Sequence, residues 1–412
     1  MTRWMTVEEA AQRLGVKTAT VYAYVSRGVL ARRRDPEGRS VFDAGEVEQL
    51  ALRGRPRRSS AHPELVIEST VTLLGEDRHF YRGRDATVLA ETWPFERVAA
   101  WLWSGDDYVH PVRWTASAEG VAAARAAQAG LPASVLPLER QQLIVAALAA
   151  ANPVRLTLEP VAVVQLGQSL IAGLVEALPF ADPARERAAA EAAGTDRPLD
   201  ERSVSVRLWA RLAGPGADPR LSDVLRYAMV LLADHELASS TLAARVAASV
   251  RADPYAVVTA ALGVVSGALH GGASLGTEAM LAETSDPSEA SAVMGRRLRQ
   301  GERVPGFGHA VYRHGDGRAN ALLNWIKGVV PGHPRLPVAD AILDEARRRR
   351  LPAVNVDFAL GLLAHLAGMP RGSGEAIFGM ARTVGWLAHA MEEYASPTKL
   401  RLRASYTGPL PG

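Results

Sequence analysis

One segment decides the fold, and it reads RVPGFGHAVYRHGDGR from Arg303 to Arg318. Two glycines flank Phe307 and predict a tight, non-helical backbone whose amides can reach a ligand. A histidine and two arginines follow directly. The pattern indicates a polar site held on a turn, and the alternative is a surface loop with scattered charges.

Composition limits the class of protein. Of the 412 residues, 48% are hydrophobic and only 6% are aromatic, so we expect a mostly helical protein of two or three domains. The absence of cysteine excludes disulfides, thiolate metal sites and a cysteine nucleophile. The first residues turn acidic at Glu8 and Glu9, where an export signal would turn apolar. The longest clean apolar run, from Ala256 to Leu269, is too short to cross a membrane, so we expect a cytoplasmic protein with no membrane partner.

Basic residues concentrate at the N-terminal end. Residues 1–60 hold 12 Lys and Arg against 7 Asp and Glu, a balance of +5, while the whole chain carries +3. The rest of the chain is therefore slightly acidic, and any attraction to nucleic acid belongs to the first segment.

Residues 4–53 predict a small domain of two helices and a wing. Thr6 caps the first helix with Glu9 as its capping-box partner, and a second helix opens at Thr18. Residues 32–42 predict a two-stranded wing before a further helix. The pattern resembles the winged helix-turn-helix domains of the mercury-resistance-regulator and excisionase type, so we expect DNA contact through residues 4–53. The alternative is a vestigial or protein-binding module.

Four polar or charged residues later in the chain are candidate site residues because of their sequence surroundings. His235 lies between two carboxylates at a helix junction, and His270 ends a buried helix at a double-glycine turn. Asp357 has apolar neighbours that favour its protonated form, which suits a general base. Arg382 lies on an otherwise apolar helix and is expected to pair with an anion. The alternative is structural: the two histidines could simply be buried and hydrogen-bonded, and Asp357 could cap the helix that follows it.

The order and spacing of six segments make residues from about 64 to the C-terminus similar to citrate synthases. The segments are LLADHELASSTLAARV, GALHGGAS, VPGFGHAVYRHGDGR, NVDFALG, ARTVGWLAHAMEE and RLRASYTGP. Each alone would be weak, but together they extend over most of the chain.

The resemblance implies a role for each site residue. Asp357 takes a proton from the methyl group of acetyl-CoA, His270 donates a hydrogen bond to the thioester carbonyl, and His309 polarises the ketone of oxaloacetate. The resemblance further implies that oxaloacetate is bound by His235, Arg318, Arg382 and, from a neighbouring subunit, Arg401. It assigns CoA binding to Pro305, Gly306, Phe307, Gly308 and Arg313. No metal and no cofactor other than the acyl-CoA cosubstrate is implied.

The implied fold is all-α, with two citrate synthase domains preceded by the small winged helix-turn-helix domain. We expect the N-terminal domain at residues 1–57, a hinged linker at 58–63, a large helical domain at 64–271 and 372–412, and a small one at 272–371. The resemblance also implies a homodimer whose active site is shared across subunits.

Two departures from the family pattern bear on the function. Ser274 and Leu275 stand where many relatives have Asn and Glu. In the C-terminal segment, Leu402 stands where relatives usually have a proline after the arginine, so either Arg401 or Arg403 could be the residue that reaches the site of the neighbouring subunit. The first hypothesis is a citrate synthase of the tricarboxylic acid cycle. The alternatives are a 2-methylcitrate synthase using propionyl-CoA and a DNA-binding regulator whose core senses a metabolite.

Overall fold

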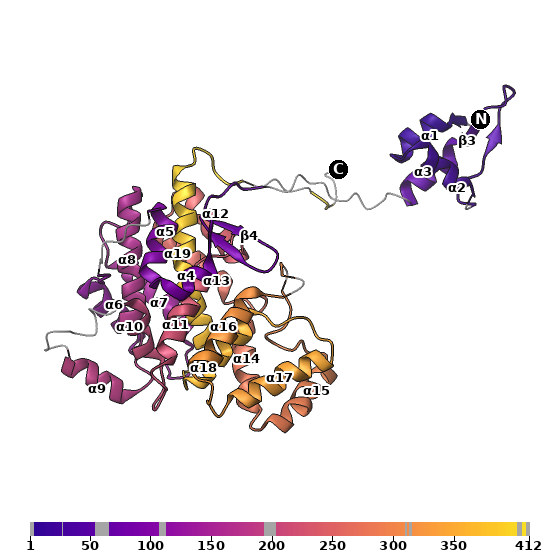
Figure 1. Cartoon of the computed structure of the whole chain (residues 1–412). Helices are drawn as coiled ribbons and strands as arrows, with labels where there is room; N and C mark the ends of the chain where they lie inside the picture. The colour runs from indigo at the N-terminus through magenta and orange to yellow at the C-terminus, as the bar shows by residue number, and fades with distance from the viewer. Residues whose placement is uncertain are drawn as a thin grey trace. The chain divides into compact units, whose positions relative to one another are not determined.

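The computed structural model describes residues 4–26, 28–53, 66–106, 113–192, 203–309, 311–312, 315–401 and 406–408. Its contacts divide the chain into two compact units, Met1–Glu68 and Ser69–Gly412. The predicted linker at 58–63 lies outside the described residues. Figure 1 shows the elements of each unit.

The N-terminal unit is a three-helix domain with a small sheet. Its elements are β1 (Trp4–Thr6), α1 (Val7–Leu14), α2 (Thr18–Ser26), β2 (Arg33–Arg34), β3 (Ser40–Asp43) and α3 (Ala44–Arg53). The predicted helices and wing are confirmed, and β1 adds a third antiparallel strand, in the order β1-β3-β2.

Local sequence explains these elements. Thr6 and Glu9 form the predicted capping box at the start of α1, and Gly15 ends the helix in the left-handed conformation with φ 69°. A separate core forms beneath them from Ala10, Ala11, Leu14, Val21, Leu30, Phe42 and Val47.

The core unit begins with a small antiparallel sheet and continues as helices. The strands are β4 (Thr72–Leu74), β5 (His79–Tyr81) and β6 (Arg84–Asp85), paired in that order. The helices of the first part are α4 (Ala86–Thr92), α5 (Phe95–Ser104), α6 (Ala118–Gln128), α7 (Pro137–Ala150), α8 (Pro160–Ala177), α9 (Pro183–Ala192), α10 (Val204–Leu212), α11 (Leu221–Leu232), α12 (Ser239–Ser249) and α13 (Pro254–Val265).

The second part carries α14 (Gly272–Glu283), the 3-10 turn η2 (Pro287–Glu289), α15 (Ala290–Arg299), α16 (Gly317–Val329), α17 (Leu336–Arg348), α18 (Val356–Leu366) and α19 (Ser373–Ala395). Figure 1 shows α14 to α18 gathered on one side of the unit, while α19 returns among the helices of the first part. Apart from the two small sheets, the described chain is helical, as the all-α expectation required.

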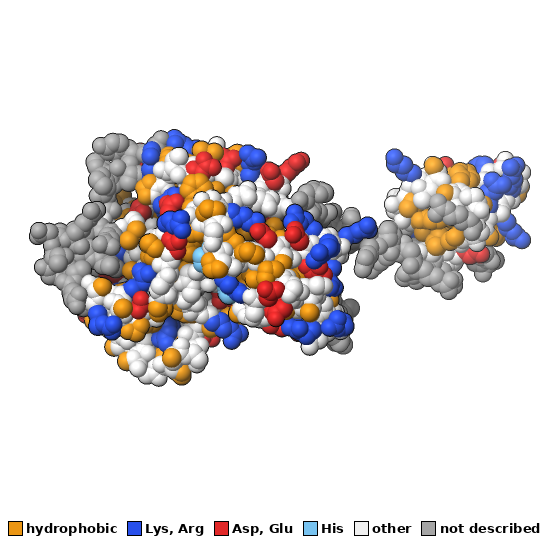
Figure 2. Space-filling model, turned by 60° about the horizontal axis from the view of Figure 1, so that its bottom comes forward, with side chains coloured by type: hydrophobic (Ala, Val, Ile, Leu, Met, Phe, Trp, Pro, Cys, Tyr) orange, Lys and Arg blue, Asp and Glu red, His pale blue; other side chains and the backbone are white. Residues whose placement is uncertain are grey.

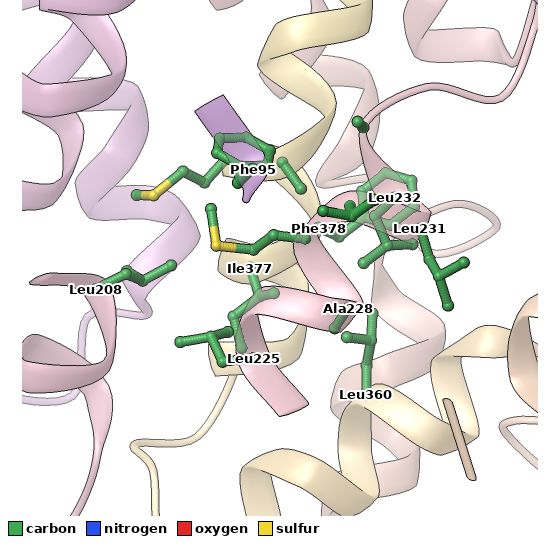
Figure 3. Packing of buried hydrophobic residues seen from close by; sticks show 14 of the residues in the cluster. Phe95, Leu208, Leu225, Ala228, Leu231, Leu232, Leu360, Ile377 and Phe378 are labelled. Carbon is green, nitrogen blue, oxygen red and sulfur yellow. The ribbon is translucent and has the colours of Figure 1, made fainter. Parts of the chain in front are cut away.

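One apolar cluster holds the core unit together. Figure 3 shows part of this cluster, with side chains from several helices, among them Phe95 of α5, Leu208 of α10, Leu225 of α11, Leu360 of α18, and Ile377 and Phe378 of α19. α19 lies at the centre, since nearly all of its residues are buried. Its glycines permit this close packing: a Cβ atom on Gly385 would lie 2.6 Å from the carbonyl oxygen of Ala233.

Two expectations about apolar runs were wrong. The 18-residue helix α8 is long and apolar enough to span a membrane by length and composition, but 56% of it is buried inside the protein. The run from Ala256 does not stay helical to Leu269, because α13 ends at Val265 and Leu269 is 93% exposed. His270 therefore stands on a turn between α13 and α14.

Candidate active site

The glycine loop at 305–308 is tied to the segment before α18. Gly306 and Gly308 both have positive φ, 84° and 89°. The Gly308 amide donates to the Ala353 carbonyl at 2.7 Å, and the Asn355 amide donates to the Gly306 carbonyl at 2.9 Å. A Cβ on Gly306 would lie only 2.8 Å from that of Phe358, so the loop needs glycine there for space as well as for φ.

His309 and His235 meet beyond this loop. Their ring centroids are 5.6 Å apart, and Tyr312 contacts both, its hydroxyl lying 2.9 Å from Nε2 of His235. Burial and the charge of Arg318 lower the pKa of both imidazoles, so both are neutral near pH 7. His235 therefore fits both alternatives from the sequence: its side chain is buried and hydrogen-bonded, and it also faces the polar site.

The hydrogen bonds of His309 fix its tautomer. Its Nδ1 accepts from the backbone amides of Val311 and Tyr312 at 3.0 and 3.2 Å, which places the proton of the neutral ring on Nε2. Nε2 lies 3.3 Å from Nη2 of Arg318. Two donors therefore converge on one place, where they require an acceptor such as a substrate oxygen.

Arg318 is fixed by Asp316, which precedes α16. Its Nε and Nη2 each lie 2.9 Å from an Asp316 carboxylate oxygen, and the same carboxylate caps α16 and accepts from the Val356 amide at 3.0 Å. Both side chains are buried. Asp316 thus sets the direction of Arg318 and joins α16 to the start of α18.

Arg382 is a buried cation with unused hydrogen-bonding capacity. It is 1% exposed, its Nε donates to the Leu232 carbonyl at 2.8 Å, and its Nη2 has no partner among the described residues. Burial lowers its pKa to about 10, so the guanidinium stays charged at neutral pH. A buried guanidinium with an unpartnered nitrogen is stabilised when an anionic group of a ligand, such as a carboxylate, pairs with it.

His270 is oriented by Ser240. The Ser240 hydroxyl accepts from the indole Nε1 of Trp386 at 3.3 Å and lies 2.9 Å from Nε2 of His270, to which it can donate or from which it can accept. When the hydroxyl donates, the proton of the neutral imidazole is on Nδ1. Burial, with the charge of Arg382, lowers the pKa of His270 to about 4, so the ring is a neutral donor.

Asp357 lies in the first turn of α18, and Asn355, not Asp357, caps that helix. Burial raises the pKa of Asp357 to about 7; Arg318 opposes this shift, while Asp316 and Glu375 add to it. The carboxyl can therefore accept a proton near neutral pH. Phe378 connects the two halves of the site, since its ring lies 5.5 Å from that of His270 and 4.5 Å from Cζ of Arg382.

Most of the predicted residues thus come together in one chain: His235, His270, His309, Arg318, Asp357 and Arg382. Ser274 is buried and donates to the Gly271 carbonyl, so it supports the His270 turn. Arg401 is exposed, and its predicted role belongs to a neighbouring subunit. Arg313, Leu402 and Arg403 lie outside the described residues.

Sequence reasoning missed the supporting residues Tyr312, Asp316, Ser240 and Asn355. A buried network behind the site was also missed, in which Arg245 bonds to Glu392, Glu393 and His389, and His389 contacts Asp234. Asp316 and Asn355 carried a local signal, because each is a preferred N-cap residue type directly before a helix.

A hollow of about 610 Å³ lies away from these residues, between α4, α11 and α16, where the rings of Tyr227 and Trp325 stack at 4.5 Å. It contains none of the residues above. Figure 2 shows small areas of histidine near the middle of one face of the core unit, in keeping with partial burial of the histidines.

Known proteins match both units. A family model described as "Citrate synthase, C-terminal domain" matches residues 63–403, and one described as "Helix-turn-helix domain" matches residues 4–55. Citrate synthase 2 of Bacillus subtilis is 35% identical over 219 residues, which are 52% of this chain and 58% of that enzyme. 2-Methylcitrate synthase 1 of Corynebacterium glutamicum is 27% identical over 343 residues, 80% of this chain and 88% of that protein.

Solved structures share the fold. The crystal structure of citrate synthase from Thermotoga maritima has a TM-score of 0.66 at 25% identity, covering 84% of this chain and 94% of that one. A ternary complex of the Thermoplasma acidophilum citrate synthase with carboxymethyl coenzyme A and oxaloacetate has a TM-score of 0.66 at 22% identity, and the match covers 85% of this chain and 96% of that one. The chain therefore belongs to the citrate synthase family and carries a helix-turn-helix domain before its core.

Proposed function

We propose that the core condenses an acyl-CoA thioester with oxaloacetate and then hydrolyses the thioester, giving citrate and CoA when the acyl group is acetyl. The observation that carries the proposal is the grouping of a base with a pKa of about 7, two neutral imidazoles and two buried arginines. An α-proton of a thioester is very weakly acidic, so its removal needs a base and an oxyanion donor together.

Each group has a distinct role in this reaction. Asp357 takes the α-proton while Nδ1–H of His270 donates to the thioester oxygen, so that the enolate forms next to the bound ketone. Nε2–H of His309 and the guanidinium of Arg318 donate to the ketone oxygen, which becomes the alkoxide. Arg382 pairs with a carboxylate of oxaloacetate through its unused nitrogen, and His235 completes the binding site.

The glycine loop is the proposed contact for CoA. The Gly308 amide and the carbonyls of Gly306 and Gly308 are already used within the chain, whereas the amides of Gly306, Phe307 and His309 bond to none of the described residues and are the proposed donors to the cosubstrate. Arg313 remains a proposed phosphate contact. Figure 1 shows α14 to α18 gathered on one side of the core unit, which supports a small domain at 272–371 that closes over oxaloacetate and excludes water.

The acyl group is either acetyl or propionyl. Relatives of both names match at similar identity. With acetyl-CoA the enzyme would supply the tricarboxylic acid cycle, in the cytoplasm; with propionyl-CoA it would make 2-methylcitrate. No metal enters either reaction as proposed.

The test is CoA release from acetyl-CoA and from propionyl-CoA in the presence of oxaloacetate. We expect turnover with at least one thioester, rising with pH through about 7 as Asp357 ionises. Asp357→Asn and His270→Ala should each lower kcat by at least ~10²-fold, since each removes a group that acts in the transition state. Absence of turnover with both thioesters would refute the proposal.

We further propose that the N-terminal unit binds DNA, with the core as enzyme or metabolite sensor. The helix-turn-helix match and the +5 balance of residues 1–60 support this. Figure 2 shows Lys and Arg side chains along one edge of this unit. Binding that weakens as salt concentration rises is the expected behaviour.

A homodimer completes the proposal. Leu242 and Val246 are exposed one turn apart on α12, and Val250 follows just after the helix. A second copy of the chain would cover this apolar stripe and would bring its own Arg401 to the site.

A further inference from the structure

A further histidine, His79, is buried beside the candidate site and takes no part in the proposed reaction. It begins the strand β5 and is 1% exposed. Its ring centroid lies 5.8 Å from that of His235, and the two ring planes are inclined at 64°, which is an edge-to-face contact. His79 therefore touches the imidazole that is proposed to bind oxaloacetate.

Rings from two parts of the chain enclose His235. Besides His79, the rings of His309 and Tyr312 lie 5.6 and 5.3 Å from it, inclined at 82° and 70°. His309 and Tyr312 belong to the proposed small domain, whereas His79 and His235 both belong to the large one. When the small domain opens, the contact with His79 remains.

Tyr81, two residues further along β5, holds His79 in place. Its hydroxyl donates to the Val230 carbonyl at 2.9 Å, accepts from the Asp234 amide at 3.2 Å and lies 3.0 Å from Nε2 of His79. Alternate residues of a strand share one face, so both side chains point the same way. The hairpin thus fixes His79 against the end of α11 and the residue that precedes His235.

His79 contributes a ring to the site and no charge. Burial, with the charges of Arg318 and Arg382, lowers its pKa to about 3, so the imidazole is neutral at the pH of the proposed reaction. The two arginines therefore remain the cations nearest to it, and both stay available to the substrate carboxylates.

We propose that His79 is a positioning residue that holds the imidazole of His235 in the orientation in which it binds oxaloacetate. This rests on the proposed role of His235. A neighbour on the same domain sets the binding ring before the substrate arrives, and such preorganisation lowers the cost of binding. The effect belongs to substrate affinity, since His79 itself contacts no reacting atom in the proposed reaction.

The first test compares the kinetics of full-length His79→Ala with those of the wild type. Removing the ring frees His235 to turn, so KM for oxaloacetate should rise about 10-fold, the order expected for one poorly oriented hydrogen bond. kcat and KM for the acyl-CoA should change much less, because closure restores the contacts of His309 and Tyr312.

The matched control is Phe80→Ala. Phe80 is half-buried on the opposite face of the same strand, so this change removes a ring from the hairpin without touching His235. All three kinetic parameters should stay near their wild-type values. A KM for oxaloacetate that is unchanged in His79→Ala, or raised equally in Phe80→Ala, overturns the proposal.

Two conservative variants separate a positioning role from a purely structural one. His79→Phe keeps a planar ring beside His235 but cannot bond to Tyr81, whereas His79→Gln keeps a polar group for Tyr81 but has no ring. We expect His79→Phe to recover most of the affinity for oxaloacetate and His79→Gln to recover little. The reverse order overturns the proposal, and so does a loss of affinity that follows Tm across the variants.

Two further measurements do not need turnover. Calorimetric titration with oxaloacetate alone should show the same loss of affinity in His79→Ala. If the wild type binds oxaloacetate but releases no CoA, the proposed condensation fails, while this loss still supports the role of His79. A ligand-free crystal structure of His79→Ala should show the His235 ring turned away from its wild-type orientation or spread over several; a single unchanged orientation overturns the proposal.

Discussion

At the scale of single residues, Arg382 has the clearest unused capacity for a ligand. A guanidinium that is almost completely buried, held by one carbonyl and left with a free nitrogen, is expensive without an anion. Binding of a carboxylate would supply the missing partner. The same residue lowers the pKa of His270, so its charge also keeps the neighbouring donor neutral.

Replacing Arg382 by lysine should therefore weaken oxaloacetate binding specifically. Loss of a charge-assisted hydrogen bond is worth about 1.5–3 kcal/mol, so kcat/KM for oxaloacetate should fall roughly 10- to 150-fold. KM for the acyl-CoA should change much less. Steady-state kinetics with each substrate varied in turn provide the measurement, with Arg296→Lys on the surface as control. Equal losses for both substrates would contradict a role in binding the oxaloacetate carboxylate.

The residues that we propose to act directly are predicted from the sequence, but the residues that hold them in place are not. His270, His309 and Asp357 stand in segments with a recognisable order, whereas Ser240 lies 30 residues from the histidine that it orients. Tyr312 lies within the decisive segment, yet only the fold shows that its hydroxyl meets His235. Contacts of this kind depend on packing between helices, which periodicity does not encode.

At the scale of elements, the caps and turn residues predicted helix boundaries well. The capping box of Thr6 and Glu9 lies where the sequence predicts it, and α13 begins at Pro254 directly after Asp253, a preferred N-cap residue. The sequence from Phe80 to Ala86 suggests a polar hook, but the segment contains the β5–β6 hairpin. Strands of two or three residues are too short for alternation to be visible in the sequence, so this sheet could not be foreseen.

The wing of the N-terminal unit makes a prediction about DNA. Arg39 is held within the wing by Asp35 and Glu37, at 2.8 and 2.6 Å, whereas Arg32 and Arg34 are exposed and have no acidic partner among the described residues. The double variant Arg32→Ala/Arg34→Ala should weaken DNA binding and reduce the salt slope by about one for each phosphate that the variant no longer neutralises. Arg39→Ala, the control, should have a smaller effect.

Fluorescence anisotropy with duplex DNA at several salt concentrations measures both quantities on the full-length protein. No binding even at low salt would end the proposal of a DNA-binding unit. Equal losses in the two variants would instead mean that the pairing of Arg39 does not reduce its interaction with DNA.

At the scale of the whole molecule, the described residues form two separate apolar cores, one in each unit. The cluster around Phe42 belongs to the N-terminal unit, and the large cluster around α19 belongs to the core. Composition and patterning predicted both, because each has its own capped, amphipathic helices. The close approach of α19 to Ala233 was not predictable, since only a glycine at 385 reveals it and many glycines have other causes.

The apolar stripe on α12 makes the last prediction, which concerns assembly. Leu242 and Val246 are 39% and 48% exposed, and burying them against a second copy would remove apolar surface that a monomer leaves in water. Light scattering should therefore find the wild type as a dimer and Leu242→Glu/Val246→Glu as a monomer. If Arg401 reaches the neighbouring site, the monomer should also lose at least ~10-fold in kcat/KM for oxaloacetate. The control is Val88→Glu, an exposed valine on α4, which should remain dimeric and active. A double variant that stays dimeric would place the interface elsewhere, and a monomer with full activity would show that each site is complete within one chain.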